Sequence, residues 1–89
     1  MQKSRQLSSN VSLEDLKIND LVDVYFYGQI IKSNCLIIKI SVNIEDQSIN
    51  EISLIHENKL ISIGNNLGDE LLFSFLKEEG LTFKKVCKF

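Results

Sequence analysis

The chain has 89 residues, which is enough for one compact domain, since a chain of this size buries only about two-thirds of its unfolded surface. Hydrophobic residues make up 44% of it, which argues against disorder, and a net charge of −2 excludes a global attraction to nucleic acid or anionic lipid. Its apolar runs are far shorter than the roughly 18 residues of a membrane helix, and residues 1–10 lack the apolar centre of a signal peptide, so we expect a cytoplasmic protein that does not enter the membrane.

The N-terminal segment is polar before it becomes structured. Residues 1–10 carry no apolar period, so we expect a flexible tail, followed by a single small domain over residues 11–89. Ser12 and Asp15 have the spacing of a capping box, in which a hydroxyl and a carboxylate three residues later begin a helix. We expect one helical turn that ends at Leu16 and lays Leu13 and Leu16 over the core as a lid.

The first strand follows a polar turn pair, Asn19-Asp20, and runs over Leu21 to Tyr27, where β-branched and aromatic residues are dense. A tight reversal at Gly28-Gln29 ends it. Because strand side chains alternate, we expect one face to be buried and the other exposed, with Val22, Val24 and Phe26 on the first and Asp23, Tyr25 and Tyr27 on the second.

The middle of the chain predicts further strands. Residues 30–32 give a short second strand, Ser33-Asn34 a turn or bulge, and residues 35–43 a long strand. We expect this strand to alternate, with Leu36, Ile38, Ile40 and Val42 inward and Ile37, Lys39 and Ser41 outward. Two more strands, over residues 49–55 and 60–63, flank the polar segment from His56 to Lys59.

The segment over residues 67–80 is compatible with two structures. Leu71, Leu72, Phe75 and Leu76 have helical spacing, and Gly80 is placed as a C-terminal cap, which gives an α+β alternative with a helix at about 67–79. We favour a strand, because the segment repeats the turn, aspartate and strand layout of the first strand. Residues 77–80 would then form a hairpin turn into a last strand over residues 81–89. The expected fold is mainly β, a small antiparallel β-barrel of five to six strands.

Aromatic and basic side chains supply a candidate partner-binding surface. Tyr25 and Tyr27 share the polar face of the first strand, and the last strand is the most basic part of the chain, so the candidates are Tyr25, Tyr27, Lys84, Lys85 and Lys88. The ordinary explanation is that the tyrosines cover the rim of the barrel and that the lysines protect an edge strand from aggregation. If Lys32 and Lys39 lay beside them, the set would form a nucleic-acid platform.

The residues that carry chemistry predict no catalytic site, no metal and no cofactor. His56 has no evident nucleophile or second acid near it in the sequence, so we interpret it as a loop or rim residue. Cys35 and Cys87 are expected to be reduced and packed, as is usual for thiols in a reducing compartment, although a disulfide between them is the alternative. We expect a protein that is not an enzyme.

The predicted strand over residues 71–76 is apolar on both faces, and such a strand must be covered on both sides. A barrel of this size covers one side. We therefore hypothesise self-association as a homodimer, or a partner domain, packed over Leu72 and Leu76.

The order of these features resembles a known family. The chain is similar to the N-terminal domain of bacterial flagellar brake proteins. The similarity lies in the segment from Leu16 to Asp20 plus its strand, the Ile/Leu-rich middle strand, Ser62-Ile63, the segment from Gly68 to Leu71 plus its strand, and Phe83 with Val86. In that family a small β-barrel precedes a PilZ module that binds cyclic di-GMP. The resemblance covers residues 16–89 and implies a protein-interaction or regulatory β-domain in cyclic-di-GMP-linked motility control.

This chain also departs from that family. The family binds the dinucleotide through an Arg-x-x-x-Arg segment and an (Asp/Asn)-x-Ser-x-x-Gly segment in the PilZ half, and the printed sequence ends about where that half would begin, with Arg5 as its one arginine. We therefore carry over no ligand residues. Two alternatives stay open: a small nucleic-acid-binding barrel of the oligonucleotide-binding or SH3-like kind, and a small mobile-element inhibitor that acts by binding a protein.

Overall fold

The computed structural model describes residues 11–86 of the chain. In this range the chain forms one short 3-10 turn, η1 (Leu13–Asp15), and six strands: β1 (Leu21–Phe26), β2 (Gln29–Val42), β3 (Ile49–His56), β4 (Lys59–Ile63), β5 (Glu70–Phe73) and β6 (Leu81–Lys85). The predicted mainly-β class and the helical turn near the N-terminus are confirmed. The predicted tail over residues 1–10, together with Cys87 and Lys88, lies outside the described residues.

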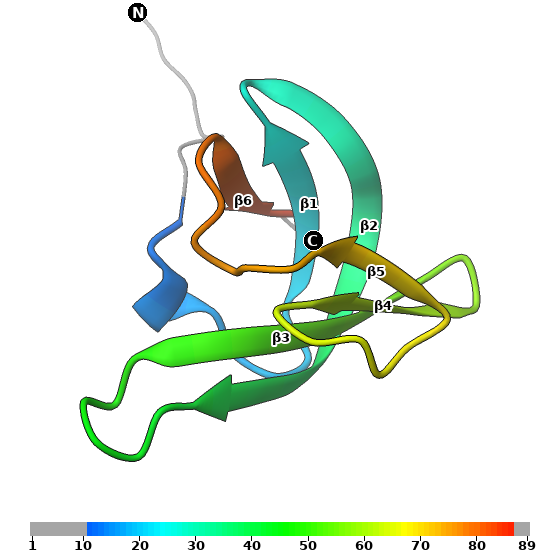
Figure 1. Cartoon of the computed structure of the whole chain (residues 1–89). Helices are drawn as coiled ribbons and strands as arrows, with labels where there is room; N and C mark the ends of the chain where they lie inside the picture. The colour runs from blue at the N-terminus through cyan, green and yellow to red at the C-terminus, as the bar shows by residue number, and fades with distance from the viewer. Residues whose placement is uncertain (1–10, 87–89) are drawn as a thin grey trace, which may run out of the picture.

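All six strands belong to one sheet, in the order β5-β4-β3-β2-β1-β6. Neighbouring strands are antiparallel except β4 and β5, which are parallel. Figure 1 shows that the sheet is strongly bent, with β2 curving along much of its length. The bend lets one face of a small sheet surround a single core.

The core is formed by side chains from every part of this sheet and from the segment before it. Val22 and Val24 are fully buried and Phe26 is half-buried, so the predicted inner face of β1 is confirmed. Leu16 is buried and Leu13 packs against the core, as the predicted lid requires. The capping box is wrong: Ser12 makes no side-chain capping hydrogen bond, and its carbonyl instead accepts the N–H of Asp15 at 3.0 Å.

Two hairpins end in turns whose central residues both have positive φ. In the β1–β2 turn these are Tyr27 (φ 50°) and Gly28 (φ 83°), and in the β3–β4 turn they are Glu57 (φ 51°) and Asn58 (φ 66°). This conformation matches the twist of the flanking strands and explains the two-residue loops. The predicted reversal at Gly28-Gln29 therefore lies one residue too far along the chain.

The predicted alternation of the long middle strand is wrong for most of its length. Ser33 and Asn34 form a bulge within β2, with Asn34 at a φ of 55°, and the Asn34 N–H donates to the Asp23 carboxylate at 2.9 Å. Beyond this bulge Cys35 and Ile37 are buried, whereas Leu36, Ile38 and Val42 are exposed. A second register shift, opposite β3 between Ile37 and Lys39, turns Ile40 back toward the core, as predicted.

Residues 67–80 contain a strand and no helix, so the helical alternative over residues 67–79 is wrong. The strand is β5, shorter than expected, and residues 74–80 form a connection that we call the β5–β6 linker. The predicted hairpin at residues 77–80 is also wrong, because β5 and β6 lie at opposite edges of the sheet and β6 pairs with β1. Figure 1 shows the linker crossing between these edges.

Candidate functional site

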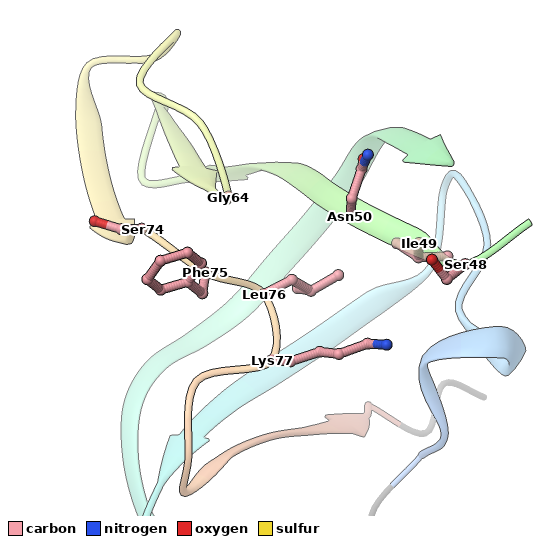
Figure 2. A pocket seen from close by; sticks show the side chains of 8 residues that line it. All are labelled: Ser48, Ile49, Asn50, Gly64, Ser74, Phe75, Leu76 and Lys77. Atoms are coloured by element: carbon pink, nitrogen blue, oxygen red, sulfur yellow. The ribbon is translucent and has the colours of Figure 1, made fainter. Parts of the chain in front are cut away.

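A pocket lies where the β5–β6 linker passes the start of β3 and the end of β4. Its volume is about 320 Å³, which is near the lower end of the range of roughly 300–1,000 Å³ for ligand pockets. Figure 2 shows Leu76 and Lys77 extending from the linker toward the start of β3. Eight residues line the pocket: Ser48, Ile49, Asn50, Gly64, Ser74, Phe75, Leu76 and Lys77.

The loop before β3 fixes one wall of this pocket. The N–H and the hydroxyl of Ser48 both donate to the same carboxylate oxygen of Asp46, at 3.0 and 2.7 Å. These hydrogen bonds to the ionised carboxylate, first that of the hydroxyl, lower the pKa of Asp46, and the nearby Lys77 ammonium lowers it slightly further. The Asp46 carboxylate, which lies outside the lining, is therefore engaged by its own loop.

Gly64 brings the end of β4 against the start of β3. Its φ is +98°, and a Cβ at this position would lie 2.5 Å from the backbone oxygen of Asn50. Its N–H donates to the Phe73 carbonyl at 2.9 Å, which holds the end of β5 beside it. Only glycine permits both the backbone conformation and the close approach, so this residue sets the shape of the pocket.

The linker supplies the wall opposite β3 by directing alternate side chains inward and outward. Leu76 is 4% exposed and belongs to the core, which anchors the segment. Phe75 is 69% exposed and Lys77 is also exposed, so an aromatic ring and an ammonium group flank the anchored leucine. Lys77 is the one ionisable side chain among the eight lining residues. The lining suits binding, with apolar walls, hydroxyls and one cation.

The two tyrosines predicted to share a surface have different neighbours. The Lys84 ammonium lies 4.5 Å from the centroid of the Tyr25 ring, so these two predicted residues do come together. Tyr27 lies in the β1–β2 turn, where its ring makes an edge contact with Phe26 and covers Gly80. One face of the Tyr25 ring is thus occupied by a lysine, whereas Tyr27 remains 63% exposed beside the turn.

The predicted lysines that the structure describes contact different partners. Lys85 lies 3.3 Å from the Asp20 carboxylate, whereas the adjacent Lys84 contacts Tyr25. Lys32 and Lys39 do not join them, because each pairs with an acidic residue of another strand, Glu70 at 3.5 Å and Glu51 at 3.8 Å. Lys88 is outside the described residues. Lys32, Lys39 and Lys85 thus each have a carboxylate partner that offsets their charge.

Cys35 and His56 are neighbours, although neither is set up for nucleophilic chemistry. His56 Nδ1 lies 2.9 Å from the Ser33 carbonyl and 3.8 Å from the Cys35 sulfur, and because a carbonyl only accepts, the proton resides on Nδ1. Burial, aided by the nearby Asp23 charge, raises the pKa of the Cys35 thiol to about 11. A neutral, fully buried thiol is neither a nucleophile nor a metal ligand at neutral pH.

Leu72 and Leu76, the two leucines predicted for self-association, do not both lie on an uncovered strand face. Leu76 is not on a strand and is buried in the core, and Leu72 is half-buried against that core. The chain itself therefore covers much of the apolar surface that motivated a partner over these residues. The homodimer stays a prediction.

No group of three or more His, Cys, Asp or Glu side chains within residues 11–86 is arranged to hold a metal ion. In the same range, no helix has the length and apolar character needed to cross a membrane.

Comparison of the chain with protein-family models, with curated proteins and with solved structures finds no match. The pocket must therefore be interpreted from its own residues. Sequence reasoning missed it because its lining comes from three separate segments, none with a recognisable motif. The one available signal was the run Phe75-Leu76-Lys77, where an apolar pair meets a cation at the end of a strand.

Proposed function

We propose that this chain is a non-catalytic protein-interaction domain and that its partner contacts the surface around the pocket. The observation that supports this is the exposed ring of Phe75 on the rim of a hollow that has a buried apolar floor. Aromatic residues that stay exposed beside such a hollow are typical of the anchors at protein interfaces. The lining offers no nucleophile with a general base beside it. Binding rather than reaction is therefore the function that it supports.

The resemblance to the flagellar brake N-terminal domain supports a regulatory role for this interaction. That family joins a small β-domain to a cyclic-di-GMP-binding module, and a mainly β chain with turn-aspartate-strand segments at Asp20 and Asp69 agrees with such a domain. On this proposal the chain acts in the bacterial cytoplasm by contacting a motility-control protein, and it needs no cofactor of its own. A mobile-element inhibitor would use the same surface against a different protein.

The test is site-specific photocrosslinking in the cells that produce the protein. Phe75 is replaced by p-benzoylphenylalanine, and the control carries the same photoreactive residue at Ile30, an exposed position at the opposite end of β2 from the pocket. We expect one discrete protein adduct from position 75 and none of that mass from position 30. The captured partner, once purified, should shift the amide resonances of residues 48–50 and 74–77. Equal labelling from both positions, or none from position 75, would contradict the proposal.

Nucleic-acid binding is the second candidate, favoured by the contact between Tyr25 and Lys84 on one face of the sheet. It has less support, because Lys32, Lys39 and Lys85 are all engaged by carboxylates. An amide-resolved titration with a mixed-sequence oligonucleotide at low and moderate salt tests it, since binding through phosphates weakens steeply with salt. Amide resonance shifts at Tyr25 and Lys84 that become smaller as salt rises would favour nucleic-acid binding over the protein-interaction proposal.

A further inference from the structure

We infer that the pocket binds an extended protein segment in which a large apolar side chain lies next to an Asp or Glu. This inference rests on the proposed interaction function and adds the chemistry of the partner. Three features of the lining carry it: the charge at its rim, the apolar walls, and the polar groups between them.

The charge at the rim favours an acidic partner. Lys77 is exposed and, among residues 11–86, forms no ion pair within 4.0 Å, whereas Lys32, Lys39 and Lys85 each have a carboxylate partner. Asp46 lies near enough for the Lys77 ammonium to lower the pKa of its carboxyl, but its carboxylate already accepts two hydrogen bonds from Ser48. The ammonium of Lys77 is therefore available to an external carboxylate, while Asp46 is held by its loop.

The apolar walls favour one large side chain. Ile49 and Leu76 pack with the core and form the inner surface, and Phe75 stands exposed beside them. An apolar side chain that enters this hollow removes the Phe75 ring from water as well as itself, which is the main source of binding free energy for such a contact. The volume of about 320 Å³ accommodates an anchor of this kind but not the face of a helix, which would need a long groove.

The polar groups favour an extended backbone. Ser48, Asn50 and Ser74 contribute polar residues to the lining, and the Ser48 hydroxyl, which donates to Asp46, can still accept a hydrogen bond. An extended segment presents unsatisfied N–H and C=O groups on either side of its anchor, and it needs such partners when it leaves water. The pocket is open to solvent, so a segment of a partner can reach the lining from outside.

The test is selection from a phage-displayed library of random linear peptides against the folded protein, with two charge-reversal variants in parallel. Lys77→Glu reverses the charge at the pocket, and Lys59→Glu is the matched control, because Lys59 is an exposed lysine in a different part of the sheet, at the β3–β4 turn. Wild type should enrich peptides with Asp or Glu beside a large apolar residue. Lys77→Glu should enrich Lys or Arg in the same place, and Lys59→Glu should match wild type.

A selected acidic peptide then gives the quantitative readout. Its affinity should fall about tenfold in Lys77→Glu, because attraction becomes repulsion at one contact, and should be unchanged in Lys59→Glu. Its binding should shift the amide resonances of Asn50, Gly64, Ser74 and Phe75. Enriched peptides whose composition does not respond to Lys77→Glu would overturn the inference, as would the absence of any enrichment.

The two proposals fail in different ways. A crosslinked partner that contacts Phe75, combined with a library that shows no acidic preference, would leave the interaction function standing and remove the acidic segment. No adduct at Phe75 and no enrichment would remove both.

Discussion

Gly64 illustrates how a single residue determines the shape of the candidate site. It combines a positive φ with a close approach of backbone to backbone, since its Cα faces the carbonyl of Asn50. Gly28 has a similar φ of +83°, but a Cβ there would meet nothing within 4 Å. A comparison of alanine substitutions at Gly28 and Gly64 therefore separates two costs. Both substitutions carry the cost of the backbone conformation, and only that at Gly64 adds the cost of the close contact.

Gly64→Ala is therefore expected to destabilise the protein more than Gly28→Ala. The Gly28 change costs about 1–2 kcal/mol, the usual penalty for a side chain in the left-handed region. The Gly64 change adds roughly 1–3 kcal/mol because the Asn50 carbonyl must move. Urea unfolding of the two variants measures the difference. Equal losses of unfolding free energy in the two variants would show that the backbone at Gly64 can move away from the Asn50 carbonyl at no cost.

The Cys35 thiol gives a prediction about pH. Its pKa rises from the ordinary 9.0 to about 11, chiefly because it is buried. Below pH 9 the thiol is neutral in both the folded and the unfolded chain, so its contribution to stability is constant. Between pH 9 and 11 only the unfolded chain ionises there, so the free energy of unfolding falls, with a limiting slope of about 1.4 kcal/mol per pH unit.

Urea unfolding at pH 8, 9 and 10 tests this for wild type and Cys35→Ala. The variant is less stable at every pH because it leaves a cavity, so the slopes and not the absolute values are compared. Wild type should lose more stability than the variant between pH 9 and 10. Parallel slopes would show that the folded protein exposes this thiol to water.

At the scale of the element, one part of β2 could be predicted from the sequence and another could not. The strand itself, and the bulge at Ser33-Asn34, were predictable from a run of β-branched residues interrupted by two polar ones. Which face lies inward was not predictable, because Cys35, Leu36, Ile37 and Ile38 are all apolar. An extra residue reverses the alternation, and its position depends on pairing with β1 and β3.

The β1 strand was predicted correctly for the opposite reason. Apolar Val22 and Val24 alternate with Asp23 and Tyr25, so only one phase buries the apolar set. The pocket could not be predicted, because it depends on how residues 48–50, Gly64 and the linker pack together across a bent sheet. Pairing of distant strands, and not local sequence, decides that arrangement.

Two adjacent isoleucines test the observed phase of β2. Ile37 is 0% exposed and Ile38 is 39% exposed, although the alternation predicted the reverse. Ile37→Ala should cost about 2–5 kcal/mol because it leaves a cavity in the core, whereas Ile38→Ala should cost less than about 1 kcal/mol. Thermal or urea unfolding compares them directly. A larger loss of stability in Ile38→Ala would show that Ile38, and not Ile37, is the buried residue, as the alternation predicted.

At the scale of the whole molecule, the β5–β6 linker joins the two edges of the sheet. It leaves β5 beside β4, passes the pocket and enters β6 beside β1. Leu76 is the point at which it enters the core. A chain of this length has one core and folds as one unit, so loss of this anchor should weaken the entire sheet and not only the linker.

Leu76→Ala is expected to lower the free energy of unfolding by about 2–5 kcal/mol. The control is Leu67→Ala, since Leu67 is a 68% exposed leucine in the β4–β5 loop and its loss should cost within about 0.5 kcal/mol. Unfolding followed by both circular dichroism and tyrosine fluorescence should give coincident transitions for both variants. A loss confined to local exchange in the linker would contradict the anchoring role.

The antiparallel pairing of β1 with β6 has a mechanical consequence. Val22 pairs with Lys85, and the Val86 N–H donates to the Leu21 carbonyl, so the start of β1 and the end of β6 lie together at one end of the ladder. Tension applied between Leu21 and Val86 loads these hydrogen bonds one at a time and unzips the pair at low force. Tension between Leu21 and Leu81 shears all of them together and should require a higher force, a contrast that optical tweezers would measure.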